Sequence, residues 1–374
     1  MSVRFETFSR ASSIDPQLWN RFAQLSSPLM EWEYFTALEE SQSVGPERGY
    51  YPSHIVAHWN GEPAALAPLY ERDRSWVEFG DGGLVQFLSE LTRIPYQRGL
   101  VGTLPFTPVP AYEFLYADNV DVPWMTRQLL NYVDYLCETR NLYTSRLYFF
   151  SPHIPEVHSI LRSQGYLTFK TGYSLWYNQG YRAFEDFLAT FKSARRTKIR
   201  REIKTIKRSG MEMKMISGLD ASDKLFETMG ELYLRTWRKH MGLEIPPFLR
   251  SEFFEHLQKS YRHRVNFCVA GHQNAPHNAM ALFYHKDRTL YGRYWGCIEE
   301  VPFLHFVLCY YYPIQYAIEH GFSVMDPGFG GEHKLIRGFE VFPVHHYIKF
   351  HGERERQVAR NVLRKMHMQP HYFS

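Results

Sequence analysis

Apolar residues recur along this chain with two different spacings. Segments such as "WMTRQLLNYVDYLCETRN" (124–141) and "LFETMGELYLRTWRKHM" (225–241) carry the spacing of an amphipathic helix, whereas "RLYFF" (146–150) and "TLYGRYWGC" (289–297) are typical of strands. The two kinds of segment alternate along the chain instead of separating into a helical part and a strand part. This order predicts a mixed α/β (α+β) protein.

The same succession of elements occurs twice. In each half two predicted helices precede a strand–turn–strand unit, "SHIVAHWNGEPAALAPLY" (53–70) in the first and "NFCVAGHQNAPHNAMALFYH" (266–285) in the second, and a helix and a strand follow. Asn60-Gly61 is a two-residue hairpin turn in the first unit. The recurrence favours a tandem duplication with mixed central sheets, in an N-terminal domain of residues 1–180 and a C-terminal domain of residues 181–374.

Composition excludes several classes of protein. The 374 residues are 44% hydrophobic, which suits two globular domains, and no apolar run reaches the ~18–20 residues that span a bilayer. No apolar signal segment opens the chain, so we expect a cytoplasmic protein. The four cysteines form no CxxC pair, and His345-His346 point to opposite faces of a predicted strand. We therefore expect no metal site.

Positive charge is concentrated in one segment. Residues 192–214 hold ten Lys/Arg and two Glu, a local net charge of +8, whereas the whole chain has only +4. Within a predicted helix over 183–208, Ile199, Ile203 and Ile206 form an apolar stripe, so the basic residues face outward. Such a face matches a phosphate backbone. A solvated charged helix, a membrane surface or a lipid-linked pyrophosphate are the alternatives.

A glycine-rich loop, "MDPGFGGEHKLIRGF" (325–339), follows the last long helix. Its glycines allow positive φ and a close approach of the backbone to a ligand. Glu332 can accept a proton from an attacking amine, and His333 can relay one near neutral pH. Lys334 and Arg337 can bind a phosphate or carboxylate. The alternative is a salt-bridged surface turn.

Two neighbouring segments carry further candidates. In "YGRYWG" (291–296) strand alternation places Arg293 between Tyr291 and Trp295 on one face, which suits a carboxylate, a phosphate or a stacked base, or else an edge-strand Arg packed on aromatics. In the next helix, helical spacing places His305 on the face of Cys309. A thiol nucleophile is disfavoured, since no third group orients the pair. Pro313 should kink this helix near the Cys309 carbonyl.

Four of these motifs also identify a family. "FLATFKSARRTKIRREIK" (187–204), "LYGRYWGC" (290–297), "LHFVLCYYYPIQYAI" (304–318) and "GEHKLIRGFE" (331–340) resemble the FemAB-like branch of the GNAT acyltransferase superfamily, in the family of peptidoglycan biosynthesis/recognition proteins. The resemblance implies a tandem pair of GNAT-like domains facing a shared cleft. It also implies acyl transfer to an amine. In the better-understood Fem relatives the donor is an aminoacyl-tRNA and the acceptor is a peptidoglycan precursor.

The resemblance and the residues together define the expected site. The pyrophosphate-binding motif of acetyl-CoA enzymes, Q/R-x-x-G-x-G/A, is missing, so we expect no cofactor and an aminoacyl-tRNA co-substrate. A CoA or carrier-protein thioester donor and a non-enzymatic binder of cell-wall fragments or nucleic acid are the alternatives. The oligomeric state stays open. The expected catalytic residues are Glu332, His333 and Lys334. The expected substrate-binding residues are Arg293, Tyr294, Trp295, His305, Asp326 and Arg337. The expected tRNA-binding residues are Arg195, Arg196, Lys198, Arg200, Arg201 and Lys204.

Overall fold

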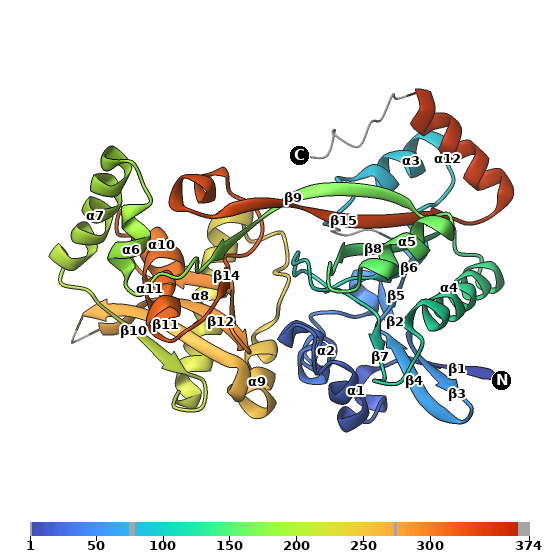
Figure 1. Ribbon diagram of the computed structural model, residues 1–374, viewed down its shortest axis with the longest axis horizontal. Coiled ribbons are helices and arrows are strands. Elements are labelled where there is room, and N and C mark those ends of the chain that lie inside the picture. The colour runs from blue at the N-terminus through green and yellow to red at the C-terminus, as the bar shows by residue number, and fades with distance from the viewer. Residues whose placement is uncertain (1, 75–78, 273–274, 366–374) are drawn as a thin grey trace. The chain divides into compact units, whose positions relative to one another are not determined.

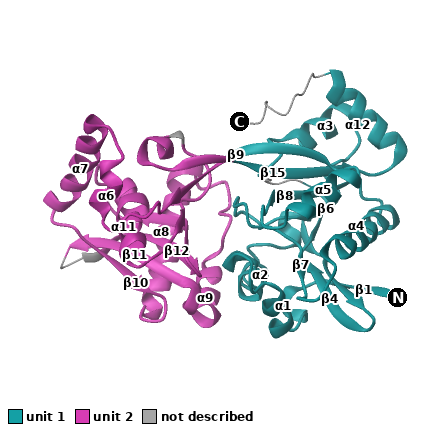
Figure 2. Cartoon of the chain, in the orientation of Figure 1, with its two compact units in different colours: residues 1–172, 343–374 teal, residues 173–342 magenta. Residues whose placement is uncertain are grey.

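The computed structural model describes residues 2–74, 79–272 and 275–365 (Figure 1). The chain forms two compact units, unit 1 with residues 1–172 and 343–374 and unit 2 with residues 173–342 (Figure 2). It leaves unit 1 within strand β9, Leu167–Tyr177, and returns within strand β15, Glu340–Phe350.

Within its described residues, unit 1 contains two sets of strands and six α-helices. One sheet has the order β1-β3-β4-β7, and the strands of the other set run in the order β15-β8-β6-β5-β2. The strands are β1 Val3–Phe8, β2 Tyr50–Pro52, β3 His54–Trp59, β4 Glu62–Ala67, β5 Tyr70–Arg72, β6 Gly99–Gly102, β7 Leu115–Tyr116 and β8 Thr144–Phe150. The α-helices are α1 Pro16–Phe22, α2 Trp32–Glu40, α3 Leu84–Thr92, α4 Val122–Thr139, α5 Pro155–Ser163 and α12 Glu353–Lys365. Asn60 and Gly61 have φ of 52° and 92°, which confirms the predicted hairpin turn.

Unit 2 is built on strands in the order β10-β11-β12-β13-β14-β9. All neighbours are antiparallel except β13 and β14, which are parallel. The strands are β10 Glu212–Ser217, β11 Val265–His272, β12 Ala275–Lys286, β13 Thr289–Cys297 and β14 Val324–Asp326. The helices are α6 Phe184–Ala189, α7 Ser193–Arg208, α8 Asp223–Met241, α9 Ser251–Ser260, α10 Leu304–Phe306, a π-helical segment Val307–Tyr311, α11 Tyr312–Glu319 and a 3-10 helix Glu332–Arg337.

One apolar core holds the site-bearing elements of unit 2 together. Ile199 and Ile206 of α7 are buried in the same cluster as Cys268 of β11 and Leu308 of the π-helical segment. Figure 1 shows α6 and α7 beside α10 and α11, and residues of α7 contact the π-helical segment. The predicted stripe of α7 is confirmed at these two isoleucines, whereas Ile203 is only partly buried.

The structure differs from the predicted elements at two places in unit 2. The helix predicted over 183–208 is two helices, α6 and α7, which are separated at residues 190–192. The predicted helix that contains His305 and Pro313 has a π-helical turn, Val307–Tyr311, which ends two residues before the proline. Proline lacks the amide that closes the preceding α-helical turn, and a π-helical turn accommodates that loss. Such turns are frequent at functional sites.

The compact units differ from the predicted domains 1–180 and 181–374 in the placement of the last strand and helix. The segment from Pro343 onward belongs to unit 1 and not to the second unit. The reason is strand pairing, because β15 pairs antiparallel with β8, with Tyr347 opposite Leu147. The tandem duplication is visible in the two hairpins, β3–β4 and β11–β12, one in each unit.

Candidate active site

The end of β14 carries a buried ion pair. Asp326 accepts two hydrogen bonds from Arg293, at 3.0 and 3.2 Å, and a third of 2.6 Å from the Tyr173 hydroxyl. The two charged side chains are only 2% and 4% exposed. Arg293 is brought here by an irregularity in the β12–β13 register, where no β12 residue lies opposite it. Because several donors satisfy the carboxylate, the pair is a rigid support for the loop that follows.

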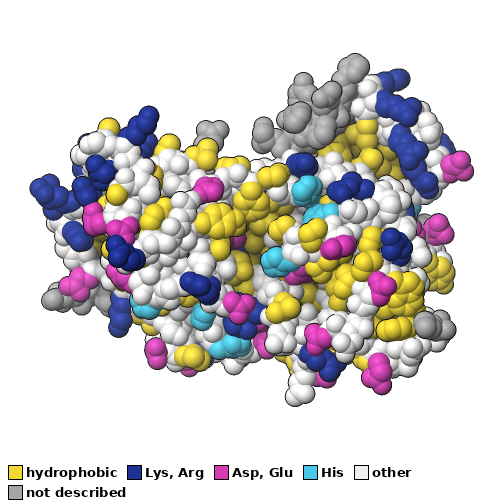
Figure 3. Space-filling model, viewed as in Figure 1, with side chains coloured by type: hydrophobic (Ala, Val, Ile, Leu, Met, Phe, Trp, Pro, Cys, Tyr) yellow, Lys and Arg dark blue, Asp and Glu magenta, His cyan; other side chains and the backbone are white. Residues whose placement is uncertain are grey.

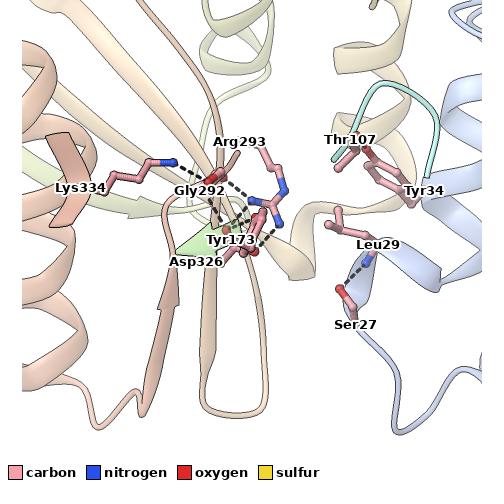
Figure 4. Close-up of polar contacts among 10 residues, drawn as sticks. Ser27, Leu29, Tyr34, Thr107, Tyr173, Gly292, Arg293, Asp326 and Lys334 are labelled. Atoms are coloured by element: carbon pink, nitrogen blue, oxygen red, sulfur yellow. Dashed lines mark hydrogen bonds and ion pairs between the residues drawn. The ribbon is translucent and has the colours of Figure 1, made fainter. Parts of the chain in front are cut away.

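The support continues into the glycine-rich loop. Gly328 has a φ of 85° and donates its amide to Asp326 over 2.8 Å. Its carbonyl accepts a 2.6 Å hydrogen bond from the Nζ of Lys334. Figure 4 shows Lys334, Arg293 and Tyr173 converging on this region from separate elements. The loop is therefore not a salt-bridged surface turn, since its lysine points inward.

Lys334 is the most unusual group of the loop. Its residue is 2% exposed, and among the described residues no carboxylate oxygen lies within 4 Å of its Nζ. Burial lowers the pKa of Lys334 to about 8, with Arg293 acting in the same direction and the Asp326 carboxylate acting against it. An amine with a pKa near 8 exists in both protonation states at physiological pH, which suits proton transfer.

Two histidines, His305 and His333, belong to one aromatic cluster. The ring of His305 lies 4.5 Å from that of Trp295 and 6.3 Å from that of His333. Burial, together with the positive charges of Lys334 and Arg337, lowers the pKa of His305 to about 4 and also lowers the pKa of His333. Both imidazoles are therefore neutral at pH 7 and can accept a proton or a hydrogen bond.

The hydroxyl of Tyr310 orients one of these rings. It lies 3.1 Å from Nε2 of His333. Burial raises the pKa of Tyr310, so the phenol keeps its proton at neutral pH. A protonated phenol can donate to Nε2, which would leave the Nδ1–H of His333 as the donor available to a ligand.

Arg337 is buried and forms an ion pair with a residue of α7. Its guanidinium lies 3.5 Å from Glu202 of α7 and stacks over Phe306 at 3.6 Å from the ring centroid. Glu202 also accepts a 2.8 Å bond from Tyr311 and is 1% exposed. The binding role predicted for Arg337 stays a prediction, but its charge already has a carboxylate partner that ties α7 to the 3-10 helix.

The structure gives no support to a role at the Lys334 site for two other candidate residues, Tyr294 and Cys309. Tyr294 packs against Tyr233 of α8 and Phe254 of α9, on the opposite face of β13 from Trp295, so the structure does not bring it to Lys334. The side chain of Glu332 lies outside the described residues. Burial raises the pKa of Cys309, which keeps it a thiol and gives no support to a thiolate nucleophile.

The basic helix has an exposed charged surface. Among its six predicted tRNA-binding residues, Lys198, Arg200, Arg201 and Lys204 are exposed, and Arg195 and Arg196 are half-buried. Figure 3 shows Lys and Arg side chains gathered over the α7 end of unit 2. Sequence reasoning missed the buried Glu202, although its position three residues after Ile199 and four before Ile206 places it within the apolar stripe.

The described residues show neither a metal-binding cluster nor a membrane-spanning helix. Within the described part of the chain, no three His, Cys, Asp or Glu side chains are placed to hold a metal ion together. None of the described helices is both long and apolar enough to cross a bilayer.

A buried loop lysine of lowered pKa, together with the neutral His305 and His333, is an arrangement suited to proton transfer. The sequence profile of the FemAB-like family, described as peptidoglycan biosynthesis/recognition, matches residues 10–371. The chain therefore belongs to the FemAB-like family. A search of curated proteins found no match for the sequence.

Solved structures share the fold at low sequence identity. FemX is 11% identical, with a TM-score of 0.57 over 97% of this chain and 100% of FemX. L-PGS from Bacillus licheniformis is 12% identical, with a TM-score of 0.53 over 95% of this chain and 98% of that one. A conserved protein of unknown function from Bacteroides thetaiotaomicron VPI-5482 is 11% identical, with a TM-score of 0.53 over 94% of this chain and 100% of that one. These likenesses confirm the predicted fold class.

Proposed function

We propose that this protein is an acyltransferase that joins an activated acyl group to an amine, with Lys334 of unit 2 as the proton-transferring residue. The observation that carries the proposal is the burial of Lys334 on the Gly328 carbonyl, which lowers its pKa to about 8. Membership of the FemAB-like family supports the reaction class. Neutral His333 and His305 supply further hydrogen-bonding groups, and the charge of Lys334 contributes to the lowered pKa of both.

The chemistry needs one group that first accepts and then returns a proton. An amine attacks the carbonyl carbon of an ester, and the new C–N bond gives a tetrahedral oxyanion. Neutral Lys334 accepts the proton lost by the amine nitrogen, and the resulting ammonium stabilises the oxyanion. When the C–O bond of the ester breaks, the ammonium returns the proton to the leaving oxygen. An ester is already activated, so positioning supplies much of the remaining rate.

We further propose an aminoacyl-tRNA as the donor and a peptidoglycan-precursor amine as the acceptor. The family description supports the acceptor class. The donor is supported by the charge on α7, where nine basic residues between Lys192 and Gly210 accompany a single acid, Glu202. That acid is buried and paired, so it does not offset the exposed charge. A surface of this kind binds phosphates with little sequence preference.

A donor screen tests this function. The purified protein is incubated with total tRNA charged with labelled amino acids and with a nucleotide-linked peptidoglycan precursor, and labelled amide products are followed by mass spectrometry. The proposal expects transfer from tRNA and none from acyl-CoA or carrier-protein thioesters. Transfer from a thioester alone would replace the donor. Ligand binding without turnover of any donor would show a non-enzymatic binder.

A further inference from the structure

A groove separate from the Lys334 site lies in unit 2. It is bordered by α6, α7, β10 and the π-helical segment with α11, and its volume is about 1030 Å³. Ligand-binding pockets typically measure about 300–1,000 Å³, so the groove is large enough for a substantial organic ligand.

The groove has one apolar wall and one basic wall. Leu188 of α6, Met211 and Met213 at β10 and Val307 of the π-helical segment line it with apolar surface. Along α7 the basic lining residues are Arg200, Lys204 and Lys207, and Ile203 and Ile206 also line the groove. Thioether side chains adapt to flexible apolar ligands. The lining is therefore complementary to a ligand with an apolar part and an anionic part.

The basic residues of α7 divide into two sets according to the lining of the groove. Arg200, Lys204 and Lys207 line the groove, whereas Lys198, Arg201 and Arg208, the far-side residues, do not. All six are exposed. Because only the first three line the groove, the two sets can be tested separately.

Only some of the basic residues that line the groove have a carboxylate partner. Arg200 pairs with Glu185, whereas Lys204 and Lys207 have no carboxylate within 4 Å among the described residues. Glu212 and Glu319 border the groove from β10 and α11. Lys204 and Lys207 therefore supply unpaired positive charge on the α7 wall, and Arg182, which precedes α6, adds a further exposed cation to the lining.

A buried layer separates this groove from the Lys334 site. Tyr311 lines the groove and donates its hydroxyl to Glu202, which pairs with Arg337. Arg337 in turn lies over Phe306, the neighbour of His333. A ligand in the groove does not reach Lys334 through these side chains, so the groove is suited to holding a molecule and not to reacting with it.

We propose that the groove binds an acyl chain of an anionic phospholipid, with the chain on the Leu188, Met213 and Val307 wall and the phosphate at Lys204 and Lys207. A polyanion such as RNA would gain nothing from the apolar wall. A neutral lipid would leave the α7 cations without a partner. The proposal does not rest on acyl transfer at Lys334.

Soluble amphiphiles test the two halves of the proposal by calorimetry. The probes are decyl, dodecyl and tetradecyl phosphate below their micelle concentrations, with glycerol phosphate as the head alone and dodecyl maltoside as the chain alone. Each methylene that becomes fully buried should tighten binding about fourfold. Dodecyl phosphate should bind at least tenfold more tightly than either partial probe. Equal binding of glycerol phosphate, or no dependence on chain length, would overturn the proposal.

Matched variants locate the binding. Arg200→Gln/Lys204→Gln/Lys207→Gln should weaken dodecyl phosphate binding at least tenfold, while Lys198→Gln/Arg201→Gln/Arg208→Gln should leave it within twofold. Met213→Trp should fill the groove and weaken binding without any change of charge. Thermal unfolding checks that each variant is folded, and the two glutamine triples alter only exposed side chains.

A vesicle assay then connects the groove to a lipid surface. The native protein and the far-side triple variant should sediment with phosphatidylcholine vesicles that contain phosphatidylglycerol. The groove triple variant and Met213→Trp should stay in the supernatant. Equal loss in both triples would show non-specific charge attraction and overturn the proposal. If an RNA duplex displaced dodecyl phosphate, and Met213→Trp bound that RNA as tightly as the native protein does, the groove would be assigned to a polyanion instead.

Discussion

Replacing Lys334 by methionine should increase the stability of the protein at neutral pH. Burial lowers the pKa of this lysine from 10.5 to about 8, because the ammonium loses water and gains only the Gly328 carbonyl as a hydrogen-bond partner. At 1.36 kcal/mol per pKa unit, the charged form is destabilised in the folded protein by roughly 3 kcal/mol. Loss of the hydrogen bond to Gly328 costs about 1 kcal/mol. Lys334→Met should therefore be stabilised by about 2 kcal/mol at pH 7.

The gain should depend on pH in a defined direction. Between the folded pKa near 8 and the unfolded value near 10.4, the unfolded chain binds more protons than the folded protein. The stability of the native protein therefore rises with pH across this interval, whereas the methionine variant lacks this contribution. The advantage of Lys334→Met should largely disappear by pH 10.

Chemical denaturation at pH 7 and pH 10 measures both effects, with Lys198→Met, at an exposed position, as the control expected to change neither value. An NMR titration of the lysine Cε resonances should also show one lysine titrating near pH 8. A variant that is less stable than the native protein at pH 7, or a stability difference that is equal at both pH values, would refute the argument.

Three further changes have defined outcomes. Asp326→Asn leaves the buried Arg293 guanidinium without a charge partner, so the free energy of unfolding should fall by roughly 3–5 kcal/mol in denaturation experiments; a loss below ~1 kcal/mol would contradict the buried pair. Gly331 has a φ of 89°, and an added Cβ would lie 2.5 Å from the His333 ring, so Gly331→Ala should lower transfer activity; unchanged activity would remove His333 from the site. Glu202→Gln should destabilise the protein by about 1–3 kcal/mol and reduce the protease resistance of α7, since Arg337 loses its carboxylate; equal resistance would contradict the tie between them.

Much of the fold of unit 2 could be predicted from local pattern. The strand predicted at 289–297 is found at Thr289–Cys297, because alternating side chains and flanking polar residues define it locally. The pairing of β15 with β8 could not be predicted in this way. Their residues lie about two hundred positions apart, so no local pattern links them.

The position of the glycine-rich loop could be predicted from the sequence, whereas the partners of its side chains could not. The glycine loop, with positive φ at Gly330 and Gly331, lies where the sequence places it. The sequence gives no sign that Lys334 turns inward to a carbonyl, because burial of a lysine depends on the surrounding tertiary structure. Arg337 was expected to face a ligand, and only the structure reveals its pairing with the buried Glu202.

Under the proposed function, Lys334 transfers the proton during acyl transfer. The most direct measurement is the single-turnover rate of amide formation from a labelled aminoacyl-tRNA as a function of pH, for the native protein and for Lys334→Met, after subtraction of spontaneous ester hydrolysis. The native rate should rise with pH and level off above an apparent pKa near 8, and Lys334→Met should be slower by ~10²–10⁴-fold. A Lys334→Met rate within twofold of the native rate, or a native rate independent of pH between 7 and 9, would contradict the claim.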